Sequence, residues 1–139
     1  MSFQAKIAGA VGAVMGAALL FILFFRTSDE AAIEAFLREG AASAQKADAD
    51  AVIAMLSTSF KSTQGDHAWA VGRIRNVLQR SPGQIEVLGV AVQVDGEEAQ
   101  ATVKLRGHLG ANELWRAGFD FRLRKEAGAW KVTSAEELR

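Results

Sequence analysis

Cysteine and tyrosine are absent from this sequence of 139 residues, which has only one proline and two histidines. Without cysteine, disulfide bonds and thiolate metal sites are excluded. The two histidines do not have the His-x-His or Glu-x-x-His spacing that places two metal ligands side by side. We therefore expect neither a metal site nor a cofactor.

Opposite charges are balanced, with sixteen basic and sixteen acidic residues. Two of the basic residues, Lys6 and Arg26, precede every acidic residue, so the chain beyond them carries 14 − 16 = −2. Proteins that bind nucleic acid need a clear basic surplus. A nucleic-acid partner is therefore not expected.

One stretch, Ile7 to Phe25, has nineteen residues without a charge, a polar side chain or a proline. As a helix it would span ~28 Å, close to the ~30 Å hydrocarbon core of a bilayer. It is longer than the apolar core of a signal peptide and ends in bulky residues rather than at a small-x-small cleavage site. We expect residues 1–26 to be a head and a retained transmembrane anchor, and residues 27–139 to form one soluble domain.

The first half of this stretch has a stripe of small residues, Gly9, Gly12, Ala13 and Gly16. Small residues at this spacing let a second membrane helix approach closely, which predicts an integral membrane partner. Basic residues are nearly balanced on the two sides of the stretch. We expect the usual signal-anchor arrangement in a bacterial inner membrane, with the amino terminus inside and the domain on the outer, periplasmic side.

The first half of the remaining chain has apolar residues at helical spacing. It predicts a helix over residues 28–45, a shorter helix after Asp48, and a third helix that begins at Asp66 and stops before Pro82. Asp66 is the expected cap of the third helix. Residues 57–63 indicate a loop or a short edge strand.

The second half of the domain alternates between apolar and polar residues, as strands do. The parity changes beside Gly89, which predicts a bulge or a sharp bend, and Asp95-Gly96 is a hairpin turn signal. The class indicated is α+β, with three helices on a curved antiparallel sheet of about four strands. The alternating stretches are residues 85–94, 99–105, 115–123 and 130–132.

Residues 29–138 resemble the nuclear-transport-factor-2-like (NTF2-like), or polyketide-cyclase-like, superfamily, which has a cystatin-like α+β cone. The resemblance lies in the long first helix, the Asp-Ala-Asp-Ala-Val-Ile-Ala-Met-Leu segment from Asp48, the helix initiated at Gly65, and the closing Gly128-Ala-Trp-Lys-Val. It implies a pocket between sheet and helices. Isomerases, cyclases, dehydratases, non-catalytic domains and membrane-anchored assembly factors all share this fold, so the fold alone selects no activity.

No catalytic set emerges from the residues. Isomerases of this superfamily use a tyrosine as an oxyanion donor, and this chain has none. Dehydratases pair aspartate with histidine, for which the candidates are Asp66, His67, His108 and Asp120. Asp66 is better explained as a helix cap, and His108 and Asp120 fall on the polar side of the sheet. We therefore predict that the protein is not an enzyme.

Two sets of residues remain as candidate sites. A pocket for an apolar ligand would be lined by aromatic side chains, whose alternative role is to fill the core. Basic side chains on the opposite sheet face would contact an acidic partner or lipid headgroups, or would form an ordinary solvated face. The first set is Phe36, Phe60, Trp69, Trp115, Phe119 and Phe121; the second is Lys104, Arg106, Arg116, Arg122 and Arg124.

These observations favour a non-catalytic, membrane-anchored accessory or assembly subunit of a larger membrane protein complex. Its partners would be the bilayer and an integral membrane protein. A second copy of the chain, forming a homodimer, is a further candidate partner. The alternative is a membrane-tethered domain that binds a small hydrophobic ligand. A tethered enzyme ranks third.

Overall fold

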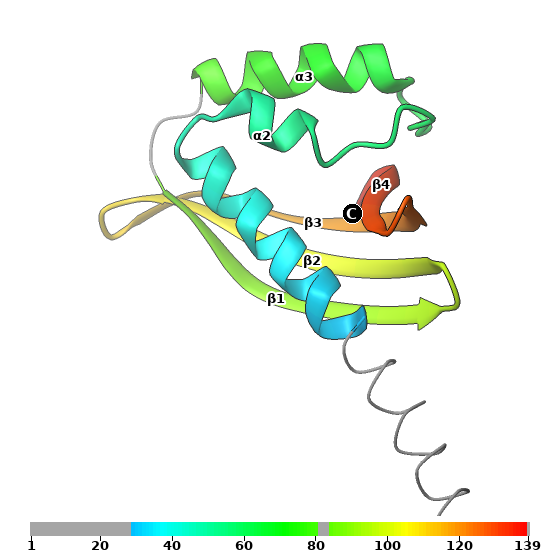
Figure 1. Cartoon of the computed structure of the whole chain (residues 1–139). Coiled ribbons are helices and arrows are strands. Elements are labelled where there is room, and N and C mark those ends of the chain that lie inside the picture. The colour runs from blue at the N-terminus through cyan, green and yellow to red at the C-terminus, as the bar shows by residue number, and fades with distance from the viewer. Residues whose placement is uncertain (1–28, 81–83, 139) are drawn as a thin grey trace, which may run out of the picture.

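The computed structural model describes residues 29–80 and 84–138. Residues 29–45 form a helix, called the first helix below, which is followed by α2 (Ala49–Ile53) and α3 (His67–Arg80). The strands β1 (Gln84–Asp95), β2 (Glu98–Leu109), β3 (Asn112–Glu126) and β4 (Ala129–Leu138) are antiparallel neighbours in chain order. The predicted α+β class, with helices packed on a four-stranded antiparallel sheet, is confirmed (Figure 1).

The predicted aspartate cap of α3 is present, and the structure adds a second one on α2. The Asp48 carboxylate accepts a hydrogen bond from the backbone N–H of Ala51 at 3.2 Å, and Asp66 accepts one from Trp69 at 3.1 Å. Each bond satisfies a backbone donor that has no partner inside its helix. The caps therefore fix where α2 and α3 begin.

The sheet bends where its register shifts. The shift between Val87 and Gly89 confirms the predicted bulge, and further shifts follow Gly107 on β2 and Arg122 on β3. A bulge bends its strand and increases the local twist. The long strands β1, β2 and β3 consequently curve beneath the helices (Figure 1).

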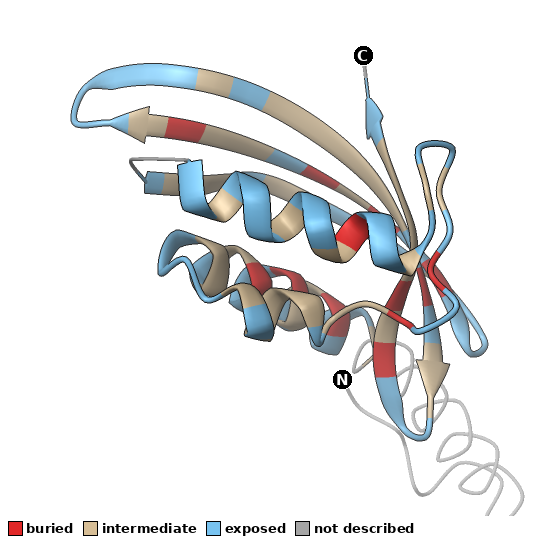
Figure 2. Ribbon diagram, turned by 90° about the horizontal axis from the view of Figure 1, so that it is seen from above, coloured by how far each residue is buried: buried red, intermediate tan, exposed pale blue. Residues whose placement is uncertain are grey.

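The core lies between the helices and one face of the sheet, called the inner face. Alternate residues of β2 point there, and Ala99, Ala101 and Val103 are at most 8% exposed. Figure 2 shows buried positions on the first helix, on α3 and along the strands. Burial of these apolar side chains is the main driving force for folding. The buried hydrophobic residues are Ile33, Leu37, Phe60, Ala70, Ala99, Ala101, Val103, Leu123, Trp130 and Val132.

The segment between α2 and α3 runs beside β4. The N–H of Ser57 donates to the carbonyl of Val132 at 2.8 Å, and the N–H of Lys61 donates to Thr133 at 3.0 Å. An edge strand otherwise presents unpaired backbone groups. The segment thus partly satisfies the edge of β4, in agreement with the predicted loop or short edge strand.

The predicted anchor, Ile7–Phe25, lies outside the residues that the structure describes, as does its stripe of small residues. Within residues 29–80 and 84–138, none of the helices combines the length and hydrophobicity needed to cross a bilayer.

Candidate ligand cavity

A cavity of about 300 Å³ lies between the helices and the inner face of the sheet. All three described helices contribute to its wall, together with β2, β3, β4 and the segment that follows α2. Almost every lining side chain is apolar. They are Leu37, Gly40, Ala41, Ala44, Val52, Met55, Leu56, Phe60, Trp69, Ala70, Arg73, Ile74, Val103, Leu105, Phe119, Phe121, Val132 and Ala135.

Small residues on the first helix leave room for this cavity. Ile33 and Leu37 fill the core near the beginning of the helix, but Gly40, Ala41 and Ala44 follow on the cavity side. A Cβ atom on Gly40 would lie 2.4 Å from Cε of Met55, so glycine allows Met55 to pack closely against the helix. The alanines do not reach across to the sheet, and the space below them stays open.

Aromatic side chains form much of the opposite wall. The rings of Phe119 and Phe121 are stacked, with centroids 5.9 Å apart and an angle of 16° between their planes. Phe60 is 4% exposed, whereas Trp69 is 38% exposed and its side chain packs against Gly65. The structure thus brings four of the six aromatic residues expected around a pocket to one cavity.

The other two aromatic candidates lie elsewhere. Phe36 packs against the core from the first helix and borders a separate depression with Ser43 and Ala54. Trp115 lies directly across from Gly107, where a Cβ atom would come within 2.2 Å of its indole ring. Its indole therefore covers a glycine of the neighbouring strand rather than the cavity.

Among the described residues that line the cavity, Arg73 is the one that carries a charge. It lies on α3 at helical spacing from Trp69 and beside Ala70 and Ile74, which also line the cavity. Among the described residues, its guanidinium group makes no hydrogen bond or ion pair. An apolar cavity with a single free cation along its wall can bind an apolar molecule and orient an anionic group.

The four catalytic candidates are dispersed. Asp66 caps α3 and His67 is its first residue, but neither lines the cavity. On the outer sheet face, Asp120 accepts hydrogen bonds from the amide of Gln100 at 3.0 Å, and Nδ1 of His108 lies 3.2 Å from the carbonyl oxygen of Gly110. These positions bring no acid and base together around a common space, which a catalytic site needs.

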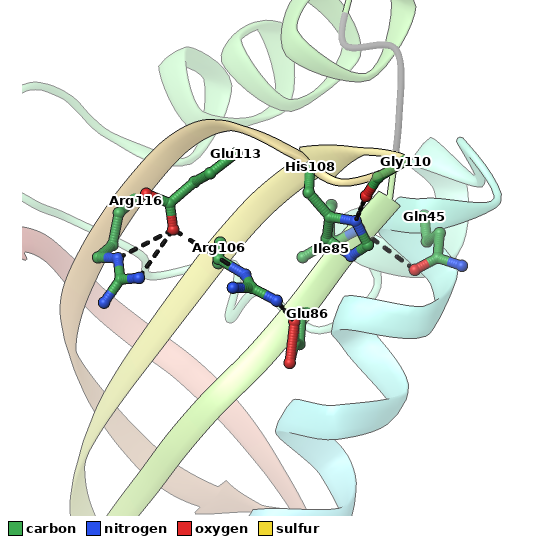
Figure 3. A network of polar contacts seen from close by, with 8 residues as sticks. All are labelled: Gln45, Ile85, Glu86, Arg106, His108, Gly110, Glu113 and Arg116. Atoms are coloured by element: carbon green, nitrogen blue, oxygen red, sulfur yellow. Dashed lines mark hydrogen bonds and ion pairs between the residues drawn. The ribbon is translucent and has the colours of Figure 1, made fainter.

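The outer sheet face carries a network of ion pairs around Arg106 (Figure 3). Arg106 pairs with Glu86 on β1 and lies 3.9 Å from Glu113 on β3. Glu113 also accepts hydrogen bonds from Arg116 at 2.8 and 3.1 Å. Two of the five basic residues predicted to contact a partner are therefore already paired with glutamates of the same face.

A second ion pair lies near the β3–β4 turn. Arg124 donates to Glu126 at 2.8 Å, and the hydroxyl of the buried Ser57 donates to the same carboxylate at 2.8 Å. These hydrogen bonds, led by that from Arg124, lower the pKa of Glu126. Lys104 and Arg122 are the remaining basic candidates, and within the described part of the chain their side chains form no ion pair.

No protein-family model matches the chain, and no curated protein matches it. Solved structures do resemble it. An NTF2-like protein of unknown function from Pseudomonas putida has 16% identity and a TM-score of 0.68, over 80% of this chain and 86% of that one. A protein with a cystatin-like fold from Nostoc punctiforme has 15% identity and a TM-score of 0.67, over 78% of this chain and 89% of that one.

A third similar structure has a provisional enzymatic name. This protein, from Novosphingobium aromaticivorans, is provisionally named an aromatic ring hydroxylase. It has 18% identity and a TM-score of 0.66, over 80% of this chain and 88% of that one. At such identities the likeness shows the fold alone. The described domain therefore has the NTF2-like, cystatin-like α+β fold, as the sequence resemblance indicated.

Proposed function

We propose that this domain binds a small apolar ligand in the cavity between its helices and its sheet. The observation that carries the proposal is the cavity itself, which is open and almost wholly apolar at about 300 Å³. Ligand sites have volumes of ~300–1,000 Å³ and a few polar groups that set orientation. The volume is at the lower end of this range, which favours a small ligand.

The composition of the lining supports binding rather than catalysis. Within residues 29–80 and 84–138, no aspartate, glutamate or histidine lines the cavity, so this part of the wall offers no carboxylate or imidazole as a general acid or base. The alternative is that these side chains only fill the core. Protein interiors are normally packed to the density of organic crystals, so a filled core would leave little empty space. A cavity of this size is therefore better explained by an occupant than by imperfect packing.

Cavity-filling substitutions test the proposal. The full chain in lipid nanodiscs would be titrated with 1-octanol, with tryptophan fluorescence and calorimetry as readouts and empty nanodiscs as the blank. Ala44→Leu places a larger side chain in the cavity and should abolish binding. Ala35→Leu makes the same change at an exposed position of the same helix and should leave binding unchanged. Absence of saturable binding to the unmodified chain would overturn the proposal.

A second function, as an accessory subunit of a membrane complex, is supported by a different observation. Leu109 and Leu114, at the tip of the β2–β3 hairpin, are 56% and 50% exposed. Exposed apolar groups of this kind are common at protein contacts. Together with Lys104 and Arg122 they would meet a partner's soluble part, while the apolar segment Ile7–Phe25 would hold the chain in the bilayer.

Extraction of the intact protein distinguishes this second function. Mild detergent should release a stable larger complex, and Gly12→Ile and Gly16→Ile should weaken it if the small-residue stripe contacts a partner helix. Recovery of a homodimer would identify a second copy of the chain as that partner. A monomer after gentle extraction would contradict the subunit function without affecting the ligand cavity.

A further inference from the structure

We infer that the ligand of the cavity is an anionic amphiphile, with its apolar part inside the cavity and its acidic group on Arg73. This inference rests on the proposed function and names the chemical class of the ligand. Its starting observation is that the described part of the cavity wall carries one formal charge, on Arg73, and has no carboxylate that would neutralise it.

The position of Arg73 suits a group at the cavity opening. Ala70 is 5% exposed and faces the interior, whereas Arg73, one turn further along α3, is both exposed and part of the lining. An arginine side chain can lay its methylene stem along an apolar wall and keep its charged end in water. A ligand buried in the cavity would therefore meet the guanidinium at its solvent end.

The neighbouring arginine on α3 shows a contrasting arrangement. Arg75 Nη2 lies 2.9 Å from Oδ1 of Asp50 on α2, so its charge is already compensated within the protein. Arg73 has no such partner among the described residues. A free guanidinium presents a planar fork of donors that matches a carboxylate or a phosphate. The charge of Arg73 is therefore available to a ligand, whereas the charge of Arg75 is not.

Two ligands with the same chain length test the inference. Octanoate and 1-octanol share an eight-carbon chain but only octanoate is anionic at neutral pH. Each would be titrated into the full chain in neutral phosphatidylcholine nanodiscs, for the unmodified protein, for Arg73→Gln and for Arg75→Gln. Circular dichroism would establish that each variant is folded before its titration is interpreted.

Arg73→Gln should weaken octanoate binding on the order of tenfold, the effect of losing one charge-assisted hydrogen bond. Because 1-octanol carries no charge, Arg73→Gln should weaken its binding much less than that of octanoate, and Arg75→Gln should change neither ligand. Equal weakening of octanoate by both variants, or no effect of Arg73→Gln, would overturn the inference while leaving the cavity function intact. If neither ligand binds the unmodified chain, the proposed function itself fails.

Discussion

The carboxylate of Glu136 accepts two hydrogen bonds from Thr63, one from the backbone N–H at 2.8 Å and one from the hydroxyl at 2.6 Å. This pair connects β4 to the segment between Phe60 and Trp69, both of which line the cavity. An ionised carboxylate therefore helps to hold the segment against β4, together with the backbone hydrogen bonds of Ser57 and Lys61.

This contact predicts a pH-dependent stability. The hydroxyl of Thr63, and then its backbone N–H, lower the pKa of Glu136 below the ordinary value of 4.5. Because the folded state has the lower pKa, the contact stabilises the fold above about pH 4.5 and is lost as pH falls through the folded value. We expect Thr63→Val to reduce the loss of stability between about pH 5 and pH 3, measured by urea unfolding.

The matched control for that measurement is Thr58→Val. Thr58 is exposed, and its side chain has no hydrogen bond to another described residue. Its replacement should leave the acid limb of the stability profile as in the unmodified chain. A Thr63→Val profile that also follows the unmodified one would contradict the role given to this contact.

The close approach of Gly107 and Trp115 predicts a sensitive position in the sheet. A methyl group at Gly107 would come within 2.2 Å of the indole ring, so Gly107→Ala should displace it and destabilise the fold by about 1–3 kcal/mol. Gly89→Ala is the control, because, apart from its two chain neighbours, no described residue has an atom within 4 Å of a Cβ there. Equal urea midpoints for the two variants would disagree with the observed packing.

The β3–β4 turn predicts a stabilising substitution. Ala127 and Gly128 both have positive φ, 50° and 82°. A residue with a Cβ is destabilised by about 1–2 kcal/mol in this left-handed region of φ and ψ. Asn-Gly is the preferred pair for such a turn. Ala127→Asn should therefore raise the thermal unfolding midpoint. The same substitution at Ala68, an exposed residue of α3, should lower it because asparagine is a weaker helix former than alanine.

The lack of cysteine makes the proposed membrane orientation directly measurable. Glu97→Cys would place a single thiol in the exposed β1–β2 turn. With the outer membrane permeabilised, a maleimide that cannot cross the inner membrane should label this thiol, whereas Ser2→Cys should react only after lysis. The reverse pattern would place the domain inside the cell.

Much of the fold follows from local chemistry. Asp66 was predicted as a cap because a short acidic side chain can accept a hydrogen bond from the next turn of backbone, and the structure shows that Asp48 acts in the same way. Gly89 was predicted as a bulge because the apolar parity changes there. The first helix was predicted to end at residue 45, and it does so in the structure. Ala47 takes a positive φ of 57° at a position where glycine is usual.

The candidate site was only partly predictable. Trp69 and Phe119 were expected near a pocket because strand parity and helical spacing put them on the inner side. Arg73 was not selected, although its spacing of four residues from Trp69 was a usable signal. Nothing in the sequence predicted that Ala41 and Ala44 would line a cavity, because small residues on a helix face indicate close packing as readily as open space.

The sequence by itself determined the class of the domain, the cap of α3, the faces of its strands and the apolar segment before it. These properties depend on residues a few positions apart. Only the tertiary structure decided that the interior retains a cavity of about 300 Å³, because its volume depends on how side chains of several elements meet. It also decided that Glu86 and Glu113 pair with Arg106, since strand register alone brings these distant residues together.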